Sequence, residues 1–130
     1  MGDAIKLPKR KPRPVLERDV LQPIREALGR LDGVVVWRNN TGLLRDRRGI
    51  PVAFGLAIGS SDLVGIVRLN GTGIGRFFAL EIKRPGEEPT DPQLDYLALV
   101  RKMGGFATWV DNVHAAVAAV CRAREQGENQ

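Results

Sequence analysis

The alternation of apolar and polar positions divides the chain into short elements typical of one small domain. Leu21, Ile24 and Leu28 recur at helical spacing with charged residues between them, which predicts an amphipathic helix over residues 16–30. Pro23 lies inside this stretch and leaves two possibilities. Either the helix kinks there, or it begins near Pro23 with Glu17 on a preceding turn.

A run of β-branched residues over 34–37 is typical of a buried strand. Residues 38–59 then contain four glycines and Pro51, which predicts a loop. A loop of this length in a small domain is usually functional or mobile.

The second half of the chain contains the remaining elements. Apolar runs over 63–69 and 77–82, joined by the glycine-rich residues 70–75, predict a β-hairpin. Thr90-x-x-Gln93 opens a helix that ends at Gly104, and residues 106–110 form another short strand. Asp111 or Asn112 caps a final helix that runs through Arg124, with an apolar face of Val113, Val117 and Val120.

These elements predict an α/β fold. The order is α-β-β-β-α-β-α, and the strand-helix-strand unit from 77 to 110 should form a right-handed parallel crossover. The expected architecture is therefore a mixed β-sheet flanked by helices.

Length and composition indicate one domain in a soluble protein. A chain of 130 residues has room for one core, and its single cysteine, Cys121, excludes an internal disulfide. No apolar stretch is long enough to span a membrane, and the N-terminus lacks the apolar core of a signal peptide. We expect a cytoplasmic protein.

The net charge of +5 lies mainly in the first fourteen residues, whose five basic residues face only Asp3. Prolines alternate with these charges, so residues 1–14 are expected to be a disordered basic arm, ahead of a domain over 15–124 and a disordered tail over 125–130. The arm either contacts phosphate or simply aids solubility.

Two carboxylates mark the candidate chemistry. Asp62 directly precedes one apolar run, and Glu81 interrupts the next. Because strand side chains alternate, Glu81 and Lys83 share one face. Two carboxylates and an ammonium suit phosphodiester hydrolysis with Mg²⁺ or Mn²⁺. The alternative is a surface ion pair of Glu81 with Lys83, with Asp62 capping a turn.

An ordered set of short motifs resembles the virus-type replication-repair nuclease (VRR-NUC) domain of the PD-(D/E)xK superfamily, which has the restriction-endonuclease-like fold. The set runs from Trp37-Arg38-Asn39-Asn40-Thr41-Gly42 through Gly59-Ser60-Ser61-Asp62-Leu63 and Glu81-Ile82-Lys83-Arg84-Pro85-Gly86 to Gln93. The similarity spans roughly residues 17–120.

The resemblance implies that Asp62, Glu81 and the backbone carbonyl of Ile82 bind the metal, and that Lys83 is the catalytic lysine. Glu17 would be the carboxylate of the first helix; a partly buried glutamate bonded to backbone is the alternative. The family proline before the acidic residue is replaced by Ser61, which removes no ligand.

The resemblance also makes Gln93 an active-site residue, although its place in Thr90-x-x-Gln93 fits a helix cap equally well. Basic and polar residues around the site are candidates for contacts with the DNA backbone, or else ordinary solvated charges. They are Arg38, Asn39, Arg45, Arg47 and Arg48, together with Lys9, Arg10 and Lys11 of the arm.

The expected function is that of a divalent-metal-dependent DNA endonuclease, selective for flaps, nicks or junctions, that acts as a homodimer as stand-alone relatives of this kind are thought to. A non-cleaving module that binds branched DNA with the same fold is the main alternative. A basic structural or adaptor protein is a third, suggested only by the arm.

Overall fold

The computed structural model describes residues 13–125. The predicted basic arm lies outside these residues except for its last two positions, and so does the predicted tail except for Glu125. Within the described range, no helix combines the length and the apolar character needed to cross a membrane.

The centre of the fold is a four-stranded sheet in the order β1-β4-β5-β6. β1 (Val34–Arg38), β4 (Leu63–Arg68) and β5 (Gly75–Ile82) are antiparallel neighbours, and β6 (Phe106–Val110) runs parallel to β5. The predicted mixed sheet and the parallel connection through the intervening helix are confirmed.

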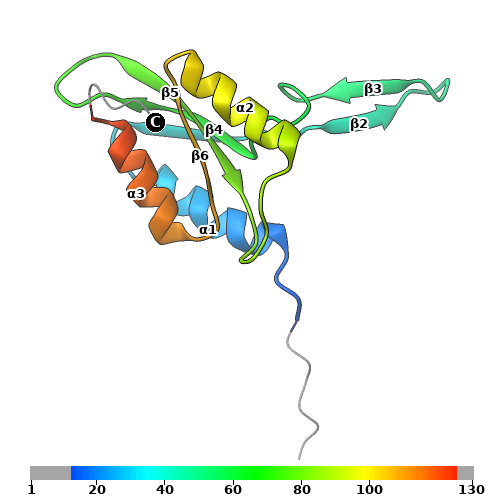
Figure 1. Cartoon of the computed structure of the whole chain (residues 1–130), viewed down its shortest axis with the longest axis horizontal. Helices are drawn as coiled ribbons and strands as arrows, with labels where there is room; N and C mark the ends of the chain where they lie inside the picture. Colours follow the sequence, from blue (N-terminus) through cyan, green and yellow to red (C-terminus); the bar gives the residue numbers. More distant parts are fainter. Residues whose placement is uncertain (1–12, 126–130) are drawn as a thin grey trace, which may run out of the picture.

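Three helices cover the sheet, α1 (Glu17–Gly29) and α3 (Val113–Ala123) on one face and α2 (Asp91–Lys102) on the other (Figure 1). Phe78, Leu80 and Ile82 of β5 point into the core beneath α1 and α3. Ala79 points into the smaller core beneath α2. This alternation places Glu81 and Lys83 on the α2 face, at the end of β5.

Helix α1 is continuous through Pro23 and begins at Glu17. The Leu16 amide donates to the Asp19 carboxylate at 2.9 Å, which fixes the start of the helix. Pro23 lies on the exposed side, where water can replace the backbone hydrogen bond that its ring removes. Of the two predicted possibilities, the start near Pro23 is therefore wrong.

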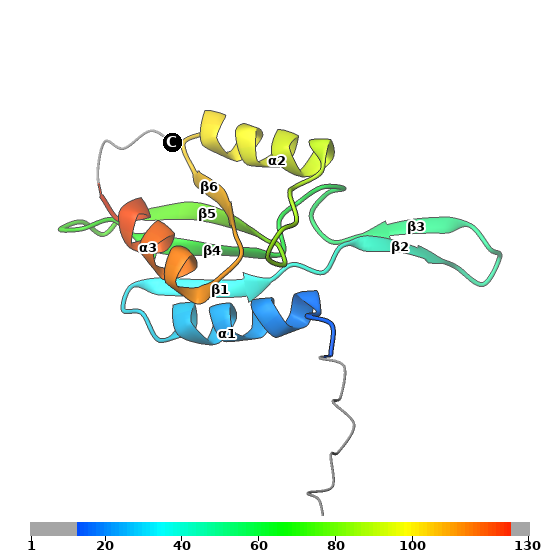
Figure 2. The ribbon, with the colours of Figure 1, turned by 60° about the horizontal axis from the view of Figure 1, so that its bottom comes forward.

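The largest correction concerns residues 38–59, which were expected to form a loop. They contain β2 (Gly42–Arg45) and β3 (Pro51–Phe54), paired in a separate two-stranded sheet, so the chain has two strands more than predicted. We call residues 42–54 the projecting hairpin, because they extend away from the four-stranded sheet (Figures 1 and 2). The glycines that suggested a loop lie at the ends and turn of this hairpin and in the segment that follows it.

Two further expectations were wrong about burial. β1 is an edge strand, and although Val34 is buried, Val35 and Trp37 are about half exposed. In α3, which Asn112 caps, the buried face consists mainly of small residues, because Val113 is exposed and Val117 only partly buried. The buried residues of α3 are Ala116, Ala119, Val120 and Ala123.

Candidate active site

Strand register brings the two predicted carboxylates together. Leu63 pairs with Leu80 in the antiparallel β4–β5 ladder, so the next residues outward, Asp62 and Glu81, lie opposite each other. The Ile82 amide donates to Asp62 Oδ2 at 2.8 Å and holds this carboxylate at the end of β5. The predicted pairing of Asp62 with Glu81 is thus present.

Glu81 is a buried carboxylate that the described residues satisfy only in part. The residue is 2% exposed, and its Oε2 has no hydrogen-bond partner among residues 13–125. Lys83 Nζ lies 3.6 Å from Glu81 Oε1, and the Lys83 side chain is 12% exposed. The ion pair is largely buried, which contradicts the surface-pair alternative.

The carboxylates change each other's protonation. Burial raises the pKa of Glu81 from 4.5 to about 8, and the charge of Asp62 and a hydrogen bond to it add to the rise, while Lys83 opposes it. Without an added positive charge, the raised pKa therefore favours protonated Glu81 near neutral pH, and its contact with Lys83 becomes an ion pair once Glu81 loses that proton.

Glu17 completes the acidic group from the first turn of α1. The residue is exposed as a whole, but partial desolvation of its carboxyl raises its pKa, and Asp62 adds to the rise by its charge and a hydrogen bond. Glu17 therefore lies close enough to Asp62 to interact with it, although α1 lies on the opposite face of the sheet from Glu81.

The residues present fit a divalent cation. A buried carboxylate oxygen without a partner among the described residues, beside a second carboxylate, is the arrangement that a hard cation with oxygen ligands would stabilise. Within residues 13–125, no three His, Cys, Asp or Glu side chains form a group that could hold a metal ion. The predicted ligand set is of a different kind, because it consists of two carboxylates and one backbone carbonyl.

Asn39 holds the segment that leads into Asp62. Its Nδ2 donates to Ser60 Oγ at 2.7 Å and to the Ser61 carbonyl at 3.0 Å, and its Oδ1 accepts from the Leu56 amide at 3.4 Å. Its own backbone amide donates to the Asp62 carbonyl at 2.8 Å. Asn39 was predicted to contact DNA, but its amide group is used within the chain.

The same segment packs on the start of α2. Gly59 has φ +81°, and a Cβ at this position would lie 2.7 Å from the Pro92 carbonyl oxygen. Gln93 follows directly, and its Oε1 accepts from the Thr90 amide at 2.9 Å, so the predicted capping box is formed. Gln93 therefore serves as a cap close to the segment that carries Asp62.

The predicted DNA-contacting arginines lie on β1 and on the projecting hairpin that follows it. Arg38 is exposed at the end of β1, and Arg45 donates to the Gly49 carbonyl at 2.9 Å. Arg48 forms an ion pair with Asp46 at 3.6 Å, and Arg47 is exposed in the same turn. Lys9, Arg10 and Lys11 lie outside the described residues.

Sequence reasoning missed two contributors to the site. Ser60 is buried and bonds Asn39, and its Oγ also donates to the Ala57 carbonyl at 2.6 Å. Arg84 forms an ion pair with Glu87 and donates to the Val15 carbonyl at 3.5 Å, which links the end of β5 to the segment before α1. A Ser-Ser pair directly before Asp62 was the signal that could have revealed the first.

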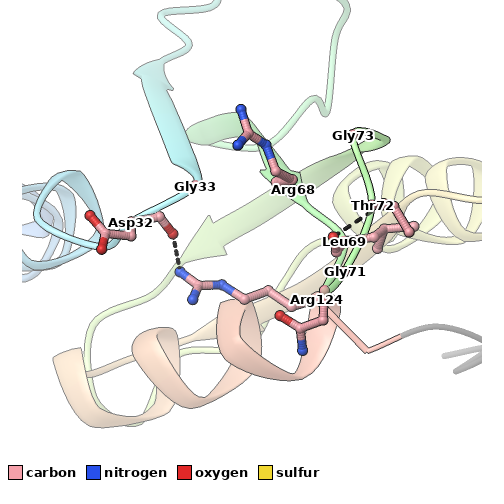
Figure 3. Close-up of a pocket in the computed structure, with 9 residues that line it drawn as sticks. Asp32, Gly33, Arg68, Leu69, Gly71, Thr72, Gly73 and Arg124 are labelled. Carbon is pink, nitrogen blue, oxygen red and sulfur yellow. Dashed lines mark hydrogen bonds between the residues drawn. The ribbon is translucent and has the colours of Figure 1, made fainter.

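A separate cavity of about 470 Å³ lies at the other end of the sheet, where the β4–β5 turn meets the ends of α1 and α3 (Figure 3). Arg124 Nη2 donates to the Asp32 carbonyl at 2.6 Å, and Thr72 Oγ1 donates to the Leu69 carbonyl at 3.1 Å. These bonds tie chain segments together, and none of the predicted site residues lines this cavity.

Comparison with protein-family models and with curated protein sequences finds no match to this chain. The resemblance to VRR-NUC domains therefore rests on the ordered motifs of the sequence alone.

Proposed function

We propose that this protein is a divalent-metal-dependent nuclease that hydrolyses DNA phosphodiester bonds, with a restriction-endonuclease-like core. One observation carries the proposal: Glu81 is buried with an oxygen that no described residue bonds, directly opposite Asp62 and beside Lys83. Burial of Glu81 beside the partly buried Asp62 costs free energy unless a cation offsets the charge or a proton neutralises it. A purely structural site would be expected to carry apolar residues here.

Each residue has a separate role in this proposal. Asp62, Glu81 and the Ile82 carbonyl would hold Mg²⁺ or Mn²⁺, which when bound activates water and neutralises charge on the phosphate. Lys83 keeps its ammonium 3.6 Å from Glu81, where it can stabilise negative charge that develops on the phosphate. Glu17, whose pKa is raised by burial and by Asp62, would add a third carboxylate from the side of α1.

DNA would lie across the start of β4 and the end of β5, flanked by the exposed Arg38 and the arginines of the projecting hairpin. Such side chains position a duplex through its phosphates without reading its sequence. This agrees with an enzyme that selects flaps, nicks or junctions by shape. The activity we propose belongs to DNA replication or repair in the cytoplasm.

The test is cleavage of labelled single-stranded, duplex, flap and four-way DNAs with Mg²⁺, with Mn²⁺ and with EDTA. Asp62→Asn and Glu81→Gln should abolish cleavage while circular dichroism remains that of the parent. The matched controls Asp91→Asn and Glu88→Gln change exposed carboxylates and should cleave normally. Full cleavage in EDTA, or by either site variant, contradicts the proposal.

The second candidate is a module of the same fold that binds branched DNA without cutting it. One observation favours this candidate: the side chain of Gln93, a predicted active-site residue, is already engaged in a hydrogen bond with the Thr90 amide. Tight binding of four-way DNA with no cleavage under any cation would favour this candidate over the nuclease.

A further inference from the structure

A groove of about 360 Å³ lies where the projecting hairpin joins the rest of the chain. Both strands of the hairpin and the segment 55–59 line it. Thr41 is the only one of its lining residues with a polar side chain. The others are glycines and five aliphatic residues, namely Leu43, Ala53, Leu56, Ala57 and Ile58. The groove therefore offers an aliphatic surface to a ligand.

Hydrogen bonds hold part of this aliphatic lining in solvent. Leu56 and Ile58 are 60% and 79% exposed. The Leu56 amide donates to Asn39 Oδ1 at 3.4 Å, and Ser60 donates to the Ala57 carbonyl from both its amide, at 3.0 Å, and its hydroxyl, at 2.6 Å. These bonds order the segment without burying its two large side chains, so folding alone does not explain why both are aliphatic. Exposed apolar residues that gather in this way mark a binding surface.

Two glycines fix the shape of the groove. Gly55 has φ +88°, and a Cβ there would lie 2.5 Å from the Asn40 carbonyl oxygen. Gly59 has φ +81° and packs in the same way on Pro92. The segment between them is thus packed against the root of the hairpin at one end and against the start of α2 at the other (Figures 1 and 2). A groove formed in advance costs a ligand little free energy of ordering.

The groove lies close to the candidate active site. Gly59 lines it, and Asp62 follows three residues later, so their Cα atoms are at most roughly 11 Å apart. The Asn39 amide, at the root of the hairpin, also donates to the Asp62 carbonyl at 2.8 Å. At ~3.4 Å per nucleotide, this separation corresponds to about three nucleotides of a DNA strand.

We propose that this groove holds one unpaired nucleobase of the DNA substrate, a few nucleotides at most from the phosphate that is cleaved. The inference rests on the proposed nuclease function and names the feature of the substrate that the site recognises. Aliphatic side chains pack well on the flat face of a base. A base in intact duplex must first be unpaired and unstacked, whereas a flap already carries unpaired bases and a nick or junction interrupts the stack.

The surrounding charge favours a nucleic acid strand over a protein segment. Arg38 is exposed at the end of β1, and the hairpin carries Arg45, Arg47 and Arg48, opposed only by Asp46. These side chains can contact the phosphates on either side of the bound base. Because the lining has one polar side chain, we expect it to accept all four bases with similar affinity.

Abasic DNA tests the contact directly. Affinity of the full chain is measured in EDTA for a labelled flap DNA and for a series in which one nucleotide at a time near the branch lacks its base but keeps its sugar and phosphate. One position should weaken binding by the parent tenfold or more. 2-Aminopurine at that position should become more fluorescent on binding, since the base leaves its stack.

Substitution of the groove identifies where that base binds. Leu56→Ser with Ile58→Ser should weaken binding of the intact flap about as much as the abasic position does, and should add less than threefold on the abasic flap. The matched control Ile74→Ser with Leu99→Ser changes aliphatic residues of similar exposure away from the groove and should behave as the parent.

Three outcomes overturn the proposal. The first is a parent for which no abasic position costs more than threefold, and the second is a groove variant that binds every DNA as the parent does, as expected if the groove holds a protein segment. The third is a groove variant that loses affinity equally for intact and abasic flaps. Cleavage is not measured here, so a base contact without any cleavage would contradict the nuclease alone, and cleavage without a base contact would contradict this inference alone.

Discussion

At the scale of single residues, the site combines groups whose protonation depends on one another. Glu81 is buried against Asp62, and Lys83 forms an ion pair with it at 3.6 Å. Each residue is nevertheless expected to affect a different measurement. Single substitutions can therefore separate three roles: stabilisation of charge on the phosphate by Lys83, binding of a proton by Glu81 and positioning of the backbone by Asn39.

Lys83→Met tests whether the ammonium acts on the phosphate. If it stabilises charge there, its loss should raise the barrier by about 3 kcal/mol or more, which is roughly 100-fold or more in rate. DNA affinity and metal affinity should change far less, because Asp62 and Glu81 remain. Single-turnover cleavage, with the exposed Lys102→Met as the control, measures this. A rate within threefold of the parent would leave Lys83 as an ion-pair partner only.

Glu81 makes the metal-free protein sensitive to pH. Its folded pKa, about 8, lies above the ordinary 4.5, so the folded state keeps a proton that the unfolded state loses. The contribution of Glu81 to stability is therefore full below pH 4.5 and falls as the pH rises toward 8, by on the order of a few kcal/mol at ~1.4 kcal/mol per pKa unit.

Thermal unfolding in EDTA from pH 5 to pH 8 measures this decline. Glu81→Gln should flatten it, whereas the exposed Glu88→Gln should not. Mg²⁺ or Mn²⁺ should raise the melting temperature most at the alkaline end, where the carboxylate has lost its proton. The same pH profile for the parent and the Glu81→Gln variant would contradict the raised pKa of Glu81.

Asn39→Ala separates positioning from DNA contact. The amide holds Ser60, Ser61 and Leu56, so its loss should let Asp62 move and lower the cleavage rate of bound DNA tenfold or more. If Asn39 contacts phosphate instead, DNA affinity should fall and the cleavage rate of bound DNA should not. The exposed neighbour Asn40→Ala is the control, and the measurements are single-turnover rate and DNA affinity.

At the scale of elements, β4 and β5 bring the two carboxylates together while the segment before β4 sets their position. Gly59 adopts φ +81° and packs against Pro92 at the start of α2. A side chain there must push α2 and the Asp62 segment apart. One glycine therefore joins the segment that carries Asp62 to the helix that covers this face of the sheet.

Gly59→Ala should therefore destabilise the protein by a few kcal/mol, through both its backbone conformation and the collision with Pro92. Gly86→Ala is matched, since Gly86 has φ +87° but nothing near its Cβ position. It should be strained by the backbone alone and lose less stability. Chemical denaturation measures the free energy of unfolding of both variants. Equal losses would show that the contact with Pro92 does not contribute to the destabilisation.

The sequence predicted the elements that have strong periodicity and failed where tertiary context decides. β6 was predicted with its observed bounds, and Asp62, Glu81 and Lys83 came together because alternation and hairpin pairing are local rules. The projecting hairpin was missed because its glycines and Pro51 resemble loop residues. The exposure of β1 was missed because a β-branched run does not reveal whether a helix covers both of its faces.

At the scale of the whole molecule, most of the basic charge and most of the predicted site residues lie in different parts of the sequence. Most of the excess charge lies in the first fourteen residues, and the remainder of the chain is nearly neutral. Attraction to DNA and chemistry on DNA should therefore respond to different changes.

Removal of residues 1–12 should leave metal-dependent cleavage intact at saturating DNA. If Lys9, Arg10 and Lys11 bind phosphates, DNA affinity should fall at low salt. The slope of log affinity against log salt concentration should then become shallower by about 0.9 for each phosphate that is no longer neutralised. Affinity titrations at several salt concentrations test this. Loss of cleavage at saturating DNA would instead support a protein whose function resides in the arm.

The β4–β5 turn lies at the far end of the sheet from Asp62 and Glu81. Gly71 and Gly73 have open space where a side chain would be. The register that pairs the two carboxylates is strongly specified by the buried face of β4 and β5, since a slip of one residue would turn that face to solvent. A fluorescent or affinity tag inserted between these glycines should therefore not reduce cleavage. Such a tag would allow the protein to be followed on DNA, because it lies far from the proposed position of the substrate.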